Sequence, residues 1–408
     1  MFKTVTLLGS SSGRNAGDAA LIASIMNELD HVSGTSLRYD IPTVRPRYIR
    51  DSYPNRTHPV GMMPWNGALR MLGLPTAASL MRTDAVVIFD AILFDRALFN
   101  PLFNFLSSLY LLLPIASARN IPIIGYNVGV GPVSTPSGRH MLRSVIERMR
   151  FCMTRDADSL ELLRELGVRN PHIGLGADCA LNAPAWNSSR VDEVFHRAGI
   201  TTEEPVLGIN INRYLDTWAS PSRPSMGREA FLQVYAAALT RVAEQIRVPF
   251  VFVTTQDHDV EITGDLMARM PSGVRTVLID KRQYDHEAIK GILRRLSLLC
   301  GMRLHSLIMA SAEMTPIVGL SYQPKVTHYF NELNIPDRTL LFDNFSPEAL
   351  SAHILRGWED RESLRNGLAV RIPELRLRSG ICGRLLDAVQ HGTEEWKAAW
   401  LRETGTRP

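Results

Sequence analysis

The residues with the clearest chemical potential lie in the second half of the chain, where Arg303 and His305 stand two positions apart. Apolar and small residues around them recur with the spacing of one helical face, at Leu304, Leu307, Ile308 and Ser311. This pattern predicts a helix that begins just after an apolar strand ending near Cys300. Arg303 and His305 would then lie in its first turn, where backbone N–H groups and the helix dipole favour an anion.

A further cation, Lys325, follows the next apolar run, Pro316 to Ser321. A right-handed βαβ crossover would bring Lys325 to the same edge of the sheet as Arg303 and His305. One imidazole and two cations at strand ends suit a substrate that carries both a phosphate and a carboxylate. On these residues alone, an Arg-x-His at a helix start is more often a capping or core feature than a catalytic one.

Arg155 opens a second segment of interest, because it stands between the strand-like run Phe151 to Thr154 and a predicted helix. Asp156 can cap that helix, and Gly167 can end it. Arg155 would therefore project from a strand end. The alternative is that it only forms a salt bridge with Asp156 or Asp178.

A third segment contains Asn15, Gly17 and Asp18, reached from the first strand through the small-residue turn Gly9 to Arg14. Such a turn lets a ligand approach the backbone closely. The segment lacks both the G-x-G-x-x-G dinucleotide fingerprint and the Gly-Lys pair of a P-loop. Asp18 is also a candidate helix cap. Two other strand ends are candidates for ligand contacts on position alone, namely Asn210 and Asn212 within 210–213, and residues 254–259.

Strand-like apolar runs alternate with helical patterns along the chain, which predicts parallel βαβ units and an α/β fold. The pattern restarts with a polar helix after Ala185. We therefore expect two doubly wound Rossmann-like domains, residues 1–185 and 186–408, that face a cleft in a GT-B-like arrangement. The first domain would be the acceptor side, and the second would carry the Arg303-Leu304-His305 motif and the terminal helices. The stretch Ser220 to Gly227 is expected to be a surface loop.

Several of these motifs resemble the polysaccharide pyruvyl transferase family. The most diagnostic are Arg303-Leu304-His305 with Ala310, Pro316-Ile317-Val318, and Tyr322 to Lys325. The segments around Arg155, Gly176 to Leu181 and Asn15 to Asp18 are similar to the family as well. One departure lies at Asp90 to Asp95, where the family often has a glycine-rich turn, and the larger side chains there would narrow the cleft.

The resemblance implies transfer of a pyruvyl group from phosphoenolpyruvate to a sugar of a cell-surface polysaccharide or its precursor, which forms a pyruvate ketal. Arg155 takes the place of the family's phosphoenolpyruvate-binding arginine. Asn15, Gly17 and Asp18 are assigned to binding of the acceptor sugar or of phosphate. The chemistry needs a proton donor that titrates near neutral pH, so His305 is expected to be the general acid. Arg155, Arg303 and Lys325 would hold the phosphate and carboxylate. We expect no cofactor and no metal.

Composition limits the partners and the compartment. The net charge of +4 on 408 residues does not favour nucleic acid. Four widely spaced cysteines and the absence of a signal-peptide pattern at the amino terminus favour the cytoplasm. The nearly uncharged stretch Ala97 to Ala118 is expected to be a buried helix, with contact at the inner membrane face as the alternative. A lipid-linked acceptor would fit that alternative. The competing function is a GT-B-type glycosyltransferase that uses a nucleotide sugar.

Overall fold

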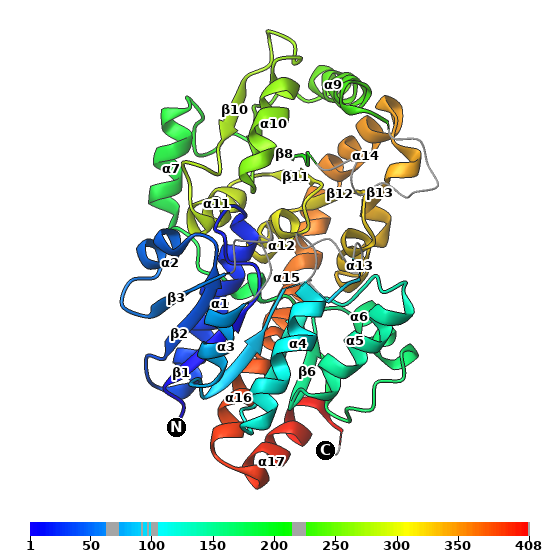
Figure 1. Ribbon diagram of the computed structural model, residues 1–408. Coiled ribbons are helices and arrows are strands. Elements are labelled where there is room, and N and C mark those ends of the chain that lie inside the picture. Colours follow the sequence, from blue (N-terminus) through cyan, green and yellow to red (C-terminus); the bar gives the residue numbers. More distant parts are fainter. Residues whose placement is uncertain (63–72, 91–92, 96–97, 99–104, 214–225, 407–408) are drawn as a thin grey trace. The chain divides into compact units, whose positions relative to one another are not determined.

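The computed structural model describes residues 1–62, 73–90, 93–95, 98, 105–213 and 226–406. In the first half of this described chain, seven parallel strands form one sheet in the order β3-β2-β1-β4-β5-β6-β7 (Figure 1). The strands are β1 Thr4–Leu8, β2 Arg38–Thr43, β3 Thr57–Gly61, β4 Ala85–Ile88, β5 Ile123–Val128, β6 Phe151–Thr154 and β7 Ile173–Leu175.

Helices alternate with these strands, as parallel pairing requires. They are α1 Ala16–Ser33, α2 Pro46–Ser52, α3 Leu74–Leu80, α4 Phe105–Ala118, α5 Pro136–Glu147 and α6 Ala157–Glu165. The strands β1, β4, β5 and β6 match four apolar runs of the sequence, namely Val5 to Leu8, Ala85 to Phe89, Pro122 to Tyr126 and Phe151 to Thr154. The edge strand β3 and its neighbour β2 were not recognised, because each contains a proline and polar residues.

A second parallel sheet contains six strands of the described chain in the order β10-β9-β8-β11-β12-β13. They are β8 Leu207–Asn210, β9 Phe250–Val253, β10 Thr276–Ile279, β11 Leu298–Gly301, β12 Ile317–Ser321 and β13 Thr339–Leu341. The helices that follow β7 along the described chain are α7 Ser188–Arg197, α9 Arg228–Gln245, α10 Val260–Met267, α11 His286–Arg294, α12 Leu304–Ala312, α13 Pro324–Glu332, α14 Pro347–Glu359, α15 Arg361–Ser379, α16 Ile381–Gln390 and α17 Thr393–Thr404. Both sheets are doubly wound α/β layers, as expected from the sequence.

By their contacts, the residues form two compact units. The first contains Met1–Gly13, Leu21–Cys179 and Leu375–Pro408, and the second contains Arg14–Ala20 and Ala180–Glu374. The end of the chain thus belongs with the first sheet, where the Asn127 amide donates to the Ser379 carbonyl oxygen at 2.8 Å. The first turn of α1, with the Asn15 segment, belongs with the second.

Each unit has its own apolar core. In the second, Phe231, Phe250 and Phe252 lie among aliphatic side chains from strands and helices. In the first, Phe105, Leu109 and Leu113 of α4 are buried against the sheet. The expected buried helix within Ala97 to Ala118 is therefore confirmed for the part that α4 covers. Among the described residues, no helix combines the length and apolar character needed to cross a bilayer.

Some sequence expectations fall on residues that the structure does not describe. These include most of the loop Ser220 to Gly227, and Ala91 and Ile92 of the Asp90 to Asp95 departure. Asp90 itself is described, and its φ of 73° lies in the left-handed region. A glycine adopts that conformation without cost, which is consistent with a family position that often carries one.

Candidate functional site

The candidate site lies at the switch point of the second sheet. The chain runs from β8 outward to β9 and β10, then returns to place β11 on the other side of β8. Asn210 ends β8, Gly301 ends β11, and the two residues are paired in register. Ligands of open parallel sheets bind at the carboxyl ends of strands where the order reverses. Arg303 and His305 follow immediately after this point.

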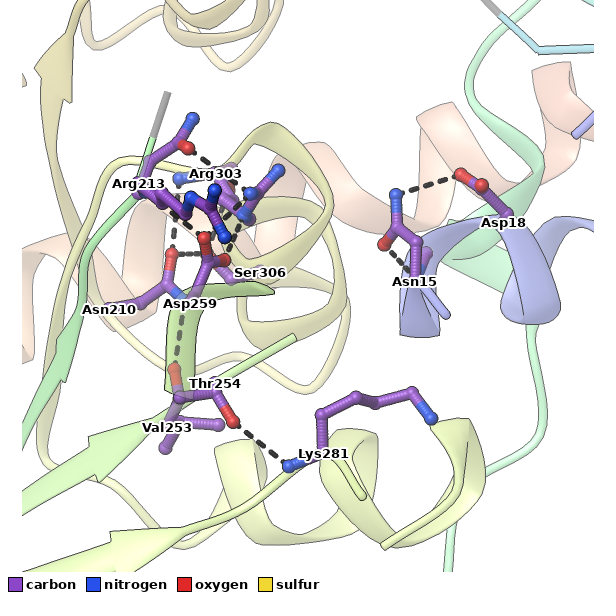
Figure 2. A network of polar contacts seen from close by, with 12 residues as sticks. Asn15, Asp18, Asn210, Arg213, Val253, Thr254, Asp259, Lys281, Arg303 and Ser306 are labelled. Atoms are coloured by element: carbon purple, nitrogen blue, oxygen red, sulfur yellow. Dashed lines mark hydrogen bonds and ion pairs between the residues drawn. The ribbon is translucent and has the colours of Figure 1, made fainter. Parts of the chain in front are cut away.

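Asn210 is fully buried and connects three segments at this strand edge (Figure 2). Its Oδ1 accepts hydrogen bonds from the backbone N–H of Arg303 at 3.1 Å and from Ser306 Oγ at 2.8 Å. Its Nδ2 donates to the Val253 carbonyl oxygen at 2.8 Å. A buried amide without partners would be costly, so this set of bonds fixes the turn that begins α12. Asn210 is therefore a structural anchor for the turn that carries His305.

Arg303 is the N-cap of α12, and its side chain is held by a fully buried carboxylate, Asp259. The Arg303 Nε donates to Asp259 Oδ2, and Nη2 donates to Asp259 Oδ1 at 2.8 Å. Nη2 also donates to Asn212 Oδ1 at 3.1 Å. Such two-point contacts between a guanidinium and a carboxylate are strong and directional. Burial raises the pKa of the nearby Tyr322 hydroxyl, which the Arg303 charge opposes and the Asp259 charge reinforces.

The first turn of α1 packs against the same unit. The Ala16 N–H donates to the Thr255 carbonyl oxygen at 2.8 Å, and the Asp257 N–H donates to the Arg14 carbonyl oxygen at 3.0 Å. Between these bonds, Asn15 forms an antiparallel bridge with Gln256. The segment that carries Asn15, Gly17 and Asp18 is thus fastened to the loop after β9.

Within that turn, Asn15 is the residue that caps α1. Its Oδ1 accepts from the Gly17 N–H at 2.9 Å, and its Nδ2 donates to Asp18 Oδ1 at 2.8 Å (Figure 2). The expectation that Asp18 could cap the helix is therefore wrong. Asp18 lies in the first helical turn, where it accepts a hydrogen bond from the cap residue.

Gly17 lies directly against the side chain of His305. A β-carbon added at Gly17 would stand 2.1 Å from His305 Nδ1 and 2.2 Å from its Cγ. His305 is half-buried in the first turn of α12. Two motifs that are far apart in the sequence therefore meet at one place.

Arg155 belongs to the first unit, directly after β6. Its side chain is buried, with Nε 3.3 Å from Asp156 Oδ2 and Nη1 3.7 Å from Asp178 Oδ2. The salt bridges considered as the alternative for Arg155 are thus both present. Asp156 also caps α6 as expected, since its Oδ1 accepts from the Ser159 N–H at 2.8 Å.

Lys325 occupies the first turn of α13, just after β12, and is half-buried. Because β12 pairs with β11, the two strands end at the same sheet edge as expected. Sequence reasoning missed Ser306 and considered Asp259 only as part of a strand end. A carboxylate at a strand end was the available signal, but its arginine partner could not be read from spacing.

The comparison with known families decides the classification. The family model for polysaccharide pyruvyl transferase matches residues 15–324, which is more than half of the chain. The chain belongs to the polysaccharide pyruvyl transferase family. The match begins at Asn15 and includes Arg155, Arg303 and His305, whereas Lys325 lies one residue beyond its end.

A protein of similar sequence is the amylovoran biosynthesis protein AmsJ of Erwinia amylovora. It is 19% identical over 412 residues, which cover 91% of this chain and 96% of AmsJ. The similarity therefore spans nearly the whole of both proteins.

Solved structures resemble the fold at much lower identity. The UDP-GlcNAc 2-epimerase from Methanocaldococcus jannaschii is 12% identical, with a TM-score of 0.61 over 96% of this chain and 100% of that chain. HepE from Anabaena in complex with UDP and glucose is also 12% identical, with a TM-score of 0.58 over 96% and 100%. At such identities the likeness establishes a GT-B-like fold alone.

Proposed function

We propose that this protein transfers the pyruvyl group of phosphoenolpyruvate to two hydroxyls of one sugar in a cell-surface polysaccharide or its precursor. Family membership supports transfer to a polysaccharide, and similarity to an amylovoran biosynthesis protein supports an acceptor of that class. The observation that carries the proposal is the packing of His305 against Gly17 at the switch point of the second sheet. A titratable imidazole at this position can deliver a proton to a bound substrate.

The reaction requires a proton and two attacks at the same carbon. His305 protonates C3 of phosphoenolpyruvate, and the C2 that becomes electrophilic is attacked by one sugar hydroxyl, which then loses its proton. The second hydroxyl displaces inorganic phosphate from C2, passes its proton to the departing phosphate and closes the ketal ring. A neutral imidazole remains after the first step and can accept a proton released by a hydroxyl. One side chain can thus serve as acid and then as base.

The donor carries a phosphate and a carboxylate, which need fixed cations. We assign Arg155 and Lys325 to these groups, with the guanidinium making directional contacts and the ammonium acting as a compact charge. Asn15, Gly17 and Asp18 are assigned to the acceptor sugar or to phosphate, as is Asn212. Arg303 makes a two-point contact with a single carboxylate, Asp259, whereas Arg155 makes single-atom contacts with Asp156 and Asp178. The scheme does not require Arg303 to touch the phosphate.

The test is a screen of oligosaccharide and lipid-linked acceptors with phosphoenolpyruvate. We expect a product whose mass corresponds to the acceptor with a pyruvyl ketal, and release of one inorganic phosphate for each ketal formed. A calorimetric titration with phosphoenolpyruvate gives a second readout that needs no acceptor. Absence of binding, together with thermal protection by a uridine nucleotide, would favour the glycosyltransferase alternative and end this proposal.

A further inference from the structure

We propose that Asp259 is a positioning residue that acts through Arg303 to hold His305 in place, an inference that rests on the proposed function. Asp259 is the last residue of the short 3-10 turn Asp257–Asp259, which precedes α10. Its side chain is fully buried, and that of Arg303 is nearly so. The ion pair is thus shielded from water. In this buried environment each charge has few alternative partners.

The geometry of the pair limits what Arg303 can do. A guanidinium holds a phosphate or carboxylate best through two parallel N–H groups on one edge. The edge formed by Nε and Nη2 already points at the two oxygens of Asp259, and Nη2 also reaches Asn212 (Figure 2). This arrangement resembles a structural clamp more than an open substrate site. Arg303 is accordingly a link between Asp259 and the start of α12.

The same carboxylate ties three strand ends together. Asp259 lies in the loop after β9, and its Oδ1 also accepts the Arg213 N–H at 3.0 Å from the chain after β8. Through Arg303 it reaches the turn after β11, whose backbone is bonded to Asn210. His305 lies two residues beyond Arg303, on the first turn that this network fixes. Loss of the carboxylate would leave the guanidinium without its counter-charge and release that turn.

The central experiment is a double-variant cycle with Asp259→Asn and Arg303→Gln. Asp259→Asn keeps the shape of the side chain and removes its charge. We expect it to lower kcat at least ~10-fold and to change the KM for phosphoenolpyruvate by less than about 3-fold, because positioning of the acid is lost while donor contacts remain. Arg303→Gln should have a similar effect. The kcat of the double variant should be no lower than that of the less active single variant, because the effects of residues that act as one unit are not additive.

The double variant also guards against misfolding, since it leaves no buried charge without a partner. Asp259→Glu retains the charge and should recover part of the lost kcat. The matched control is Asp280→Asn, at the end of the neighbouring strand β10. Asp280 makes a two-point pair with Arg282, but Arg282 is largely exposed and the pair does not reach α12. That variant should keep the kcat of the wild type.

Three outcomes would overturn the proposal: a normal kcat in Asp259→Asn, additive losses in the double variant, or an effect confined to KM. Amide hydrogen exchange at Arg303 separates this inference from the proposed function, because it requires no substrate. We expect faster exchange in Asp259→Asn than in the wild type, since the Arg303 N–H bond to Asn210 would open more often. Faster exchange without pyruvyl transfer by the wild type would preserve the positioning role and refute the function. Unchanged exchange in Asp259→Asn, together with pyruvyl transfer by the wild type, would refute the positioning role and preserve the proposed function.

Discussion

Gly17 lies so close to His305 that a β-carbon at position 17 would fall 2.1 Å from the imidazole Nδ1. Non-bonded carbon and nitrogen atoms do not approach to that distance, so the absence of a side chain allows the imidazole to occupy this space. The contact lies within one unit and joins the first turn of α1 to the first turn of α12. The Asn15 segment therefore helps to set the position of the His305 imidazole, the proposed general acid.

The first prediction concerns Gly17→Ala. The added methyl group should displace His305 and lower kcat roughly 10- to 100-fold, because a shift of about 1 Å in a catalytic group has an effect of that order. The fold should survive, since alanine favours a helix by up to about 1 kcal/mol over glycine. Steady-state kinetics measures kcat, and far-UV circular dichroism checks that the fold is retained. Gly264→Ala is the matched control, because an added β-carbon there meets no atom within 4 Å. Equal kcat values in the two variants would contradict the prediction.

The second prediction concerns His305 itself. His305→Ala should lower kcat on the order of a hundredfold to ten-thousandfold, the usual contribution of a positioned acid. Single-turnover measurement of phosphate release with a saturating acceptor isolates this step. His353→Gln, in α14, should retain the wild-type rate and serves as a comparison. An unchanged kcat in His305→Ala would remove its assigned role.

The third prediction concerns the donor-binding cations. Arg155→Ala and Lys325→Ala should raise the KM for phosphoenolpyruvate more than they lower kcat. Contacts that hold the substrate equally well in the ground state and in the transition state affect KM rather than kcat. Arg155→Ala also leaves Asp156 and Asp178 without their ion pair, so Arg155→Lys is the better-tolerated variant. The control for Arg155 is Arg164→Ala on the exposed face of α6. If donor affinity by calorimetry were the same in all of these proteins, neither residue would contact the donor.

The elements that carry the motifs could be predicted from the sequence because their patterns are local. The buried runs of β1, β4, β8 and β11 are apolar and continuous, as expected for strands covered on both faces. The stripe of Leu304, Leu307 and Ile308 predicted α12, and all three side chains are buried. The strand β13, which is only three residues long, gave no such signal.

The pairing of Arg303 with Asp259 could not be predicted in the same way. The two residues lie in loops after different strands, and only the sheet order brings those loops together. Each loop is compatible with many partners when the order of strands is unknown. The attachment of Asn15 to Gln256 has the same origin, because it depends on tertiary contacts of the turn before α1. Spacing identified the chemistry of these residues but not the side chains that hold them.

The last prediction concerns stability at acid pH. Burial lowers the pKa of His353 to about 4 from its ordinary 6.5, against the hydrogen bond with the Arg338 carbonyl oxygen and with help from the Arg338 charge. Between these values the unfolded chain binds a proton that the folded chain does not, so stability falls as the pH drops from 6.5 towards 4. From pH 7 to pH 5 the loss should be roughly 1 to 2 kcal/mol.

His353→Gln should remove that part of the pH dependence, whatever its effect on stability at pH 7. The pKa of His286 is lowered to about 4 as well, again chiefly by burial. The stability of the His353→Gln variant should therefore still fall as the pH drops, but less steeply. Urea unfolding of the wild type and the variant at pH 7 and pH 5 gives the comparison. The variant should lose less stability than the wild type over this interval, because its unfolded chain has one fewer group to protonate. Identical losses in the two proteins would show that His353 is not held neutral by the fold.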